Sequence, residues 1–470
     1  MPNNTIHSTI DCIISWLRRV KTFDNRSQLA EIIRSGNLKK LSDEQAVRLL
    51  YRQFEPEFDR LKHVDYTLEQ GDGDLIKGSL GRKGRTPSQF LFRHDFAEIN
   101  RTVVNFLSLK WLLEDNHRAF TANQPSVVKL SETTFKDFRD LARDILKTTD
   151  DILALVVSLV LGDVGKDPHL EEDIIQQGGL SKNLNHDEVL ASAIALHMFD
   201  KPLGLLSGEK RGEVILGVKV GAKLNIPQLT QGENVPGSLQ SILMLQDHEQ
   251  AFNLKYLEIM LDVSGAGGHV DARGAIRMIE PVCQSFLSAY PVLKNIITEK
   301  LPVRDAYNMV LHNRGQLLAK QDFHALDTNN PSERAFLRLC AMGRVADKDL
   351  AELFEKAFRG LEPRIREELI KGLNVDGCDG EDAVILYYMP AIFAEALRVT
   401  RSAPDCKKIQ VLQSLMSFME RTYTNAERDV GHPGAIVERD VSPAKDYIQR
   451  EGFLDDPTIL NQCVLPVKTY

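Results

Sequence analysis

Apolar residues recur at three- and four-residue spacing along most of this 470-residue chain. Within Phe90–Glu114, for example, one helical face carries Phe92, Phe96, Ile99, Val103, Phe106 and Leu107. This period indicates helices, whereas a half-buried strand alternates every second residue. Only Glu213–Val220 (E-V-I-L-G-V-K-V) is a candidate for a short strand or hairpin. The pattern therefore predicts an all-α fold with at most a small β-hairpin.

No break in composition marks a linker between domains. Chains of this length often form two or three domains. Because the helical patterns continue without such a break, we expect one large helical domain over residues 1–425 that carries the active site. Residues 426–470 are polar and contain prolines, so they are expected to form an irregular C-terminal arm.

Composition narrows the class of protein. The net charge of −8 is unlike that of a uniformly basic nucleic-acid binder, although 58 lysines and arginines leave room for a local basic groove. Six cysteines are scattered without a Cys-x-x-Cys pair, which is typical of reduced thiols. The start of the chain lacks a signal-peptide pattern, and no run approaches ~18 apolar residues. We therefore expect a cytoplasmic protein with no membrane partner.

Two segments share one arrangement of polar residues. Leu161–Asp187 begins L-G-D-V-G-K-D-P-H, and Leu261–Asp271 reads L-D-V-S-G-A-G-G-H-V-D. Each follows a long apolar helical run, places an aspartate at the expected helix end, and adds a glycine turn and a histidine. Two such helix ends can direct carboxylates and imidazoles into one common pocket. We predict that one buried or partly buried pocket collects Asp163, His169, His186, Asp262 and His269.

The side chains in these segments suit acid–base chemistry. Imidazoles change charge near neutral pH and serve as general acids, bases or metal ligands. His186 is therefore our first choice as catalytic base and His169 our second, while Ser264 is a candidate nucleophile. The alternative is structural, with Asp163 ending a turn and Asn185 capping the next helix. The candidate catalytic residues are His186, His169, Asp163, Lys166, Ser264 and His269.

Three glycines occupy four positions of the second segment, namely Gly265, Gly267 and Gly268. Glycines let backbone N–H groups approach a ligand closely, as in an oxyanion hole or a phosphate-binding turn. We expect these residues to contact substrate. A helix C-cap followed by a tight turn is the alternative.

The segment Leu75–Gln89 combines glycines with basic residues and shows no apolar period. A basic loop of this kind can follow a phosphate backbone without base readout. An ordinary solvated loop is the alternative. The chain has no G-x-x-x-x-G-K-[ST] motif and no glycine pattern typical of a dinucleotide site, so we do not expect ATP to activate the substrate. The residues predicted to contact a polyanion are Lys77, Arg82, Lys83 and Arg85.

The run L-V-L-G-D-V-G-K, which ends at Lys166, resembles the L-H-D-h-G-K motif of the HD superfamily. Asp163 and Lys166 match, and His186 and Asp262 could correspond to further ligands. Gly162 stands where the motif has a metal-binding histidine, which removes a neutral nitrogen from a site that needs several. The resemblance implies an HD-like helical scaffold and, as an alternative function, a metal-dependent phosphohydrolase or diiron oxygenase. We predict no metal and no cofactor.

Over nearly its full length the sequence resembles a group of fungal proteins that includes the arginine-containing cyclodipeptide synthases. The Asp163–His169 and Asp262–His269 segments and the N-H-D-E-V step carry this resemblance. It implies an enzyme that takes arginine and a second amino acid, at least in part from aminoacyl-tRNA, and joins them into a cyclic dipeptide for secondary metabolism. Aminoacyl esters are already activated, which agrees with the missing ATP-binding motif.

Such an enzyme needs a base for the attacking amine, donors for the tetrahedral oxyanion, and carboxylates for the guanidinium. The expected partners are arginyl-tRNA and small-molecule amino acids, with a second aminoacyl-tRNA as a further candidate, and the basic loop Lys77–Arg85 would meet the tRNA. A third possibility is a non-enzymatic helical scaffold, in which the Asp163 and Asp262 carboxylates point to solvent. The residues expected to bind substrate are Asp262, Asp187, Glu172, Gly265, Gly267 and Gly268.

Overall fold

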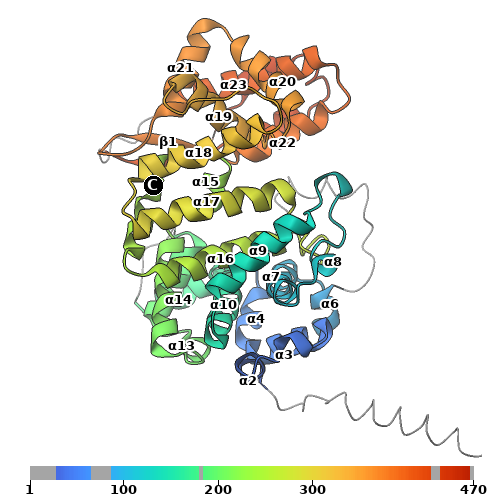
Figure 1. Ribbon diagram of the computed structural model, residues 1–470, viewed down its shortest axis with the longest axis vertical. Helices are drawn as coiled ribbons and strands as arrows, with labels where there is room; N and C mark the ends of the chain where they lie inside the picture. The colour runs from blue at the N-terminus through green and yellow to red at the C-terminus, as the bar shows by residue number, and fades with distance from the viewer. Residues whose placement is uncertain (1–27, 65–85, 179–183, 425–433, 466–470) are drawn as a thin grey trace, which may run out of the picture.

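The computed structural model describes residues 28–64, 86–178, 184–424 and 434–465. Figure 1 shows two groups of helices stacked along the long axis, which we call the N-terminal and C-terminal lobes. The predicted all-α fold is confirmed, because the described chain is helical apart from one two-stranded sheet. None of the described helices is both long enough and apolar enough to cross a membrane. The basic loop residues Lys77, Arg82, Lys83 and Arg85 lie outside the described residues.

The helices of the N-terminal lobe pack around a large apolar core. The first half of this lobe contains α2 (Leu29–Arg34), α3 (Asp43–Gln53), α4 (Glu55–Leu61), α6 (Pro87–Phe92), α7 (Ala97–Leu113), α8 (His117–Phe120), α9 (Glu132–Ile145) and α10 (Thr149–Leu161). The second half contains α11 (Pro168–Gln176), α12 (His186–Ala195), α13 (Asp200–Leu203), α14 (Gly208–Gly221), α15 (Ile226–Thr230), α16 (Glu249–Gly265) and α17 (Glu280–Thr298). Short 3-10 turns join them at η1 (Leu38–Lys40), η2 (Ser126–Val128), η3 (Val164–Lys166) and η4 (Pro236–Leu245).

The C-terminal lobe has a second apolar core, and α18 (Val303–Ala319) contributes residues to both cores. Its helices are α19 (Pro331–Met342), α20 (Lys348–Arg359), α21 (Pro363–Asn374), α22 (Met389–Val399), α23 (Asp405–Thr424) and α24 (Ala444–Ile448), with the turn η5 (Pro457–Gln462). Val441, Ala444 and Ile448 pack into this core. The segment expected to be an irregular arm therefore contains, among its described residues, regular elements with buried side chains.

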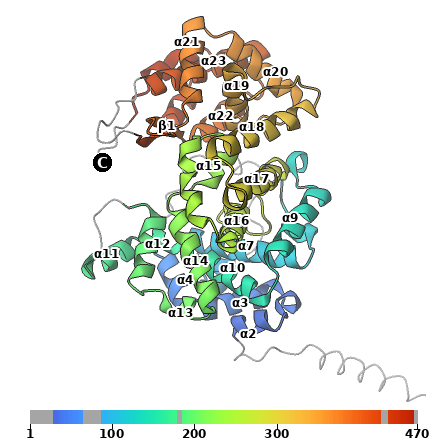
Figure 2. The same cartoon turned by 60° about the vertical axis from the view of Figure 1, so that its left-hand side comes forward.

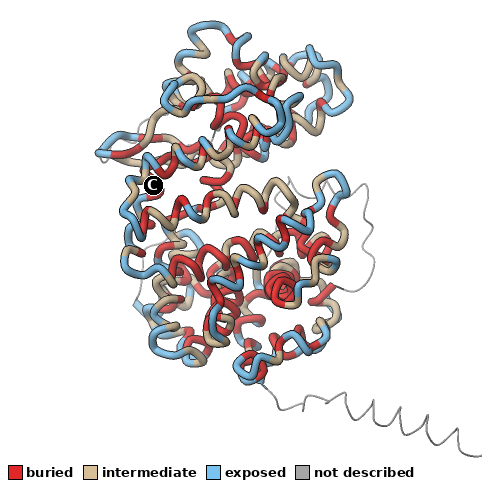
Figure 3. The backbone as a smooth tube through the Cα atoms, viewed as in Figure 1, coloured by how far each residue is buried: buried red, intermediate tan, exposed pale blue. Residues whose placement is uncertain are grey.

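Three helices at the centre of the N-terminal lobe are buried on most sides. Nearly every residue of α7 is buried, and α10 and α16 lie against it. Figure 3 shows buried backbone concentrated around these helices. α7 carries several polar side chains, and because most of them are buried with its apolar residues they need polar partners inside the protein. Glu98, Arg101 and Asn105 of this helix form part of the site described below.

The small sheet differs from the predicted hairpin. Glu213–Val220 lies inside α14, whose Ser207 cap accepts a hydrogen bond from the Lys210 backbone N–H. This run lacks strict alternation, so its apolar residues serve the helix packing of α14 against α16 and α12. The strands are instead β1 (Ala383–Tyr387) and β2 (Ile436–Asp440), which pair in parallel. β1 is a short continuous apolar run, which is ambiguous between helix and strand in sequence.

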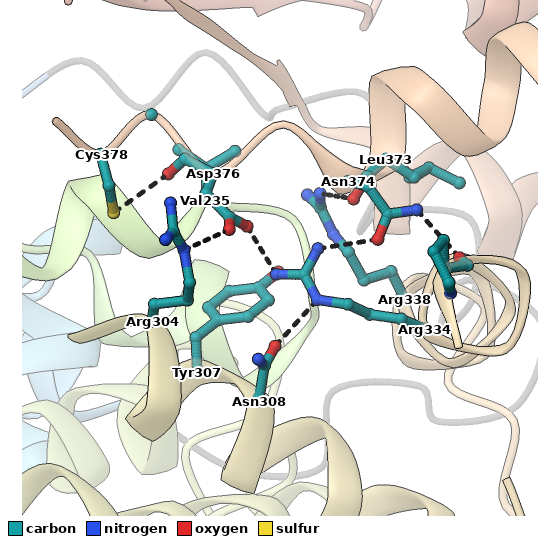
Figure 4. A network of polar contacts seen from close by, with 12 residues as sticks. Val235, Arg304, Tyr307, Asn308, Arg334, Arg338, Leu373, Asn374, Asp376 and Cys378 are labelled. Atoms are coloured by element: carbon teal, nitrogen blue, oxygen red, sulfur yellow. Dashed lines mark hydrogen bonds and ion pairs between the residues drawn. The ribbon is translucent and has the colours of Figure 1, made fainter. Parts of the chain in front are cut away.

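A polar network joins the loop after α15 to α19 and α21 (Figure 4). The guanidinium of Arg338 is fully buried and donates to the carbonyl oxygens of Leu373 at 2.6 Å and Asn234 at 2.9 Å. Arg334 binds the Asp376 carboxylate at 2.6 Å, and Tyr307 donates to the Asn234 carbonyl at 2.8 Å. Because buried backbone carbonyls need donors, this network fixes the loop that leads into η4.

Candidate functional site

A cavity of about 790 Å³ opens between the N-terminal lobe and the sheet. Its wall is formed by residues of α7, α10, α12, α14, α15, α16, η4 and both strands, and of the turns between them. Figure 2 shows α12 and α14 next to each other on this side of the molecule. Among the described residues that line the cavity, five are acidic and two are lysines, so the wall is rich in negative charge. They are Asp163, Asp187, Glu258, Asp262 and Glu438, with Lys223 and Lys255.

Lys166 joins two buried carboxylates, one of which, Asp163, lines the cavity. Its Nζ donates to Asp163 Oδ1 at 2.6 Å and to Glu98 Oε1 at 2.7 Å. α10 ends just before Asp163, and the single turn of η3 brings Lys166 back toward it. Glu98 comes from the first turn of α7, next to Arg101 at 3.4 Å. The cluster therefore pairs two carboxyl groups with two cations inside the protein.

The protonation of this cluster is set by burial and by its neighbours. Burial and the nearby Asp163 carboxylate together raise the pKa of Glu98 to about 7, against the opposing effect of Lys166 and Arg101. Burial also favours neutral Asp163, but Lys166 and Arg101 outweigh this effect and hold its pKa below the ordinary value. For Lys166 the loss of hydration favours the neutral amine, yet Asp163 and Glu98 raise its pKa. At neutral pH, Asp163 and Lys166 are thus charged, while Glu98 is partly protonated.

Asp262 lies on the cavity wall one helical turn beyond Glu258. Asn105 of α7 donates to its Oδ1 at 3.1 Å. Burial raises the pKa of Asp262, and the negative charge of Asp163 raises it further. A cation that binds beside a buried carboxyl group with a raised pKa stabilises its charged form. Asp262 is therefore suited to hold a cationic group of a ligand.

A second ion pair on α16 lies along the same wall. Lys255 Nζ binds Glu258 Oε1 at 2.7 Å, and the Ser158 hydroxyl donates to the other oxygen of Glu258. Burial raises the pKa of Glu258, and Lys255 opposes this rise. Because Glu258 is already paired with Lys255, Asp262 is the acidic residue of α16 that is better placed to bind a cation of the ligand.

His186 and Asp187 enter the cavity from the start of α12. Asn185 caps this helix by accepting the Glu188 backbone N–H at 2.9 Å, and Glu188 accepts the Asn185 N–H at 3.0 Å. The capping box fixes where the helix begins and hence where His186 lies. Its Nε2 is 3.6 Å from Asp187 Oδ1, and its side chain is 45% exposed. A ring that is both anchored and accessible can exchange a proton with a bound ligand.

The structure brings together part of the predicted site. Asp163, His186 and Asp262 line one cavity, as predicted, and Asp187 joins them. The prediction of a single pocket for all five residues is wrong for the other two histidines. His169 is exposed on α11, and His269 is buried but is not part of the wall. The repeated sequence pattern does not repeat in space, because α16 continues past its aspartate whereas α10 ends before its own.

The remaining predicted residues have other surroundings. Glu172 is exposed on α11, 3.5 Å from the Nδ1 atom of His169, and does not line the cavity. Ser264 is buried, and its hydroxyl donates to the Met260 carbonyl one turn earlier at 2.8 Å. That contact is typical of a serine inside a helix and does not present a nucleophile to the cavity.

The three glycines after Asp262 serve close packing rather than a ligand turn. A Cβ at Gly265 would lie 2.6 Å from the Arg101 carbonyl oxygen, and one at Gly268 would lie 2.7 Å from that of Asn100. A Cβ at Gly267 would lie 2.4 Å from the Ile276 side chain. The end of α16 therefore touches the backbone of α7, which corrects the expectation that these residues contact substrate.

We expect Gly265→Ala to destabilise the protein by about 3 kcal/mol, because the added methyl meets backbone that cannot turn away. The matched control is Gly212→Ala on α14, where a Cβ meets nothing within 4 Å. That control should be neutral or more stable by about 0.5–1 kcal/mol. Urea unfolding of both variants measures the difference. Equal stability of the two variants would mean that α7 and α16 can separate at little cost.

Several residues of the site are missing from the sequence-based prediction. They are the α7 residues Glu98, Arg101 and Asn105, the α16 residues Lys255 and Glu258, and Glu438 of β2. A signal for the α7 and α16 residues exists, because both helices carry polar residues at three- or four-residue spacing within an otherwise apolar run. Charged residues on a buried face are costly unless paired, so such a row points to a cluster.

The residues around Asp163 do not fit the metal centre of the HD superfamily. Gly162 supplies no ligand atom, and the Lys166 ammonium binds Asp163 at 2.6 Å in place of a metal cation. Among the residues that the structure describes, the histidines and carboxylates close enough to share one ion are His63, Asp167 and His169. None of these three lines the cavity.

Comparison with known proteins gives one match. Residues 47–460 match the family described as a family of unknown function, DUF6829. No curated protein and no solved structure matches the chain. The matched range includes all the elements of the cavity wall. Because it covers most of the sequence, the chain belongs to the DUF6829 family.

Proposed function

We propose that the cavity binds the arginyl group of arginyl-tRNA and that the protein joins it to a second amino acid, also delivered as aminoacyl-tRNA, to give a cyclic dipeptide. The observation that carries this proposal is the acidic wall, on which five carboxylate residues outnumber two lysines. A guanidinium is a planar cation that carboxylates bind through paired hydrogen bonds. A volume of about 790 Å³ is within the range of small-molecule sites.

Asp262 is the first choice for the guanidinium ligand. It lies on the wall with a raised pKa, and the uncharged amide of Asn105 donates a hydrogen bond to it. Asp187 and Glu438 are further acids on the wall. Asp163 is already paired with Lys166 at 2.6 Å, so its role is to keep negative charge beside Asp262. The scaffold alternative has both aspartates pointing to solvent, and their place on the cavity wall supports a binding site instead.

The chemistry can be written with His186 as base. The amine of one amino acid attacks the ester carbonyl of the other, and His186 accepts the proton that the amine loses. The C–O bond to tRNA then breaks, and the 3′-hydroxyl of the tRNA leaves with a proton. A second attack of the same kind closes the ring and releases the second tRNA, so each amide uses one ester. The loop Lys77–Arg85 remains the predicted tRNA contact.

We expect arginine to bind the purified protein at least tenfold more tightly than citrulline, its uncharged analogue of nearly equal shape. Asp262→Asn should remove this preference, because an amide cannot form a charged pair with guanidinium. Asp349→Asn, at an exposed position on α20, serves as the control and should keep it. Calorimetric titration measures both ligands. Equal affinity of the parent protein for arginine and citrulline would contradict the proposed substrate.

The reaction itself is tested by expressing the protein in a host and analysing extracts by mass spectrometry. The host supplies its own charged tRNA pool. A cyclic dipeptide that contains arginine, present with the parent and absent with Asp262→Asn, is the expected result. If arginine binds selectively and no cyclic dipeptide forms, the binding part of the proposal stands and the reaction is wrong.

A further inference from the structure

Two histidines and one aspartate meet where α4 approaches the start of α11. His63 follows α4, Asp167 is the N-cap of α11, and His169 lies in the first turn of α11. One potential ligand atom from each residue lies within 4.8 Å of the others. The two imidazole rings are 4.9 Å apart in an edge-on arrangement. These residues lie outside the cavity described above.

The spacing of this group suits a small metal ion. His63 Nδ1 and Asp167 Oδ1 are 3.4 Å apart. Two ligands of one tetrahedral zinc ion, each about 2.0–2.1 Å from the metal, lie about 3.3–3.4 Å from one another. All three ligand atoms lie within 4.8 Å of one another, and the side chains of both histidines are about half exposed, so their rings have room to turn toward one ion.

The aspartate is the fixed member of the group. The Asp167 side chain is fully buried, and its Oδ2 accepts a hydrogen bond from Arg60 at 2.9 Å. Its Oδ1 accepts the His169 backbone N–H at 3.1 Å. A carboxylate held by such contacts is preorganised, and the two imidazoles can adjust around it. Outer contacts that orient ligands in this way are a regular feature of metal sites.

The surroundings favour a cation. Arg60 is shared between Asp167 and Asp173, which it binds at 2.8 Å. Glu172 lies 3.5 Å from the Nδ1 atom of His169. Two carboxylates share this one guanidinium and Glu172 adds a third negative charge, which leaves an excess of negative charge beside two imidazoles. With Nδ1 of His169 turned toward Glu172, Nε2 is the nitrogen available to the ion, and Glu172 can accept the other ring N–H.

We propose that His63, Asp167 and His169 bind one divalent transition-metal ion of the zinc class. Imidazole nitrogens and a carboxylate are ligands that zinc and its neighbours accept, whereas magnesium and calcium prefer oxygen alone. The site ties α4 to the segment that directly follows Lys166, so a bound ion stabilises the end of the cavity wall. The proposal does not depend on the reaction proposed for the cavity.

Zinc titration of the full-length, metal-stripped protein tests the site. The parent should bind one equivalent of zinc, and the double variant His63→Gln/His169→Gln should not bind it. The matched control is His197→Gln/His324→Gln, which removes two other exposed histidines. Each of them also stands beside one acid, at 3.3 Å from Asp200 and 3.4 Å from Glu355. The control should keep the equivalent, and zinc should raise the Tm of the parent and the control but not of the test variant.

Cobalt substitution identifies the ligands. An ion held by nitrogen and oxygen should show weak visible bands without the strong near-ultraviolet band of a cobalt–thiolate bond. The proposal is overturned if the parent binds no zinc, or if the His63→Gln/His169→Gln protein binds zinc as the parent does. It is also overturned if the cobalt ion that replaces this zinc shows a cobalt–thiolate band. The measurement is direct binding, so its outcome is separate from any result on cyclic dipeptide formation.

Discussion

Replacement of His186 by glutamine should lower the rate of cyclic dipeptide formation by about 10²–10⁴-fold, the usual effect of losing a general base. His186 lines the cavity at the start of α12, with its Nε2 3.6 Å from Asp187 Oδ1. Its side chain is 45% exposed, so a bound amine can reach it. Glutamine keeps most of the volume and can hydrogen-bond, but it cannot accept the amine proton.

The assay for this variant uses a single turnover with preloaded aminoacyl-tRNA, so that binding and chemistry are separated. Arginine affinity and Tm should stay at the parent values, because the helix start is fixed by Asn185 and Glu188 and not by the imidazole. His197→Gln is the control, since His197 is an exposed histidine 3.3 Å from Asp200. If His186→Gln forms product at the parent rate, the base is another group.

The helices of this fold can be predicted from sequence because their signals are local. Thr148, Ser42 and Asn185 each begin a helix with a capping box, followed by apolar residues at helical spacing. The sheet could not be predicted in the same way. β1 and β2 are separated by more than forty residues, and neither shows a signal until the other lies beside it. Parallel pairing depends on the tertiary fold.

The site was predictable where side chains follow the end or the start of a helix. Asp163, His186 and Asp187 stand at such positions, and they do line the cavity. The sequence also predicts that Ser264 and the nearby glycines meet the substrate, yet the Ser264 hydroxyl bonds to its own helix and Gly265 and Gly268 pack against α7. Sequence gives the chemistry that a side chain can perform, while the direction in which the side chain points depends on the neighbouring helices.

The second large effect is on stability. We expect Lys166→Met to lower the free energy of unfolding by about 3 kcal/mol near pH 8, because it leaves Glu98 and Asp163 buried without their shared cation. Removal of one partner of a buried ion pair costs about 3–5 kcal/mol, and the lower end applies since the Lys166 side chain is 23% exposed. Denaturant unfolding measures the loss. Lys371→Met, whose lysine binds Glu368 on the surface, should change little.

The effect of Lys166→Met should shrink as the pH falls from 8 to 5. In the parent the raised pKa of Glu98, about 7 against an ordinary value of 4.5, means that its contribution to stability is fully present below pH 4.5 and is lost as the pH rises through 7. Without the ammonium the carboxyl is still harder to ionise. Protonation of Glu98 at acidic pH therefore removes part of the variant's loss of stability. A loss caused by packing alone would be the same at pH 5 and at pH 8.

A second substitution separates charge from packing. Glu98→Gln removes one of the two carboxylates that Lys166 binds, so in the Lys166→Met background it should restore at least about 1 kcal/mol at pH 8. In the parent background the same change removes a partner of Lys166 and should not stabilise the protein. A cycle in which the two losses simply add would mean that Lys166 acts through its aliphatic chain. Coupling between the two losses would show that Lys166 acts as an internal cation. The position of the Asp163 carboxylate then depends on this cation, and so does the negative charge that Asp163 places near Asp262.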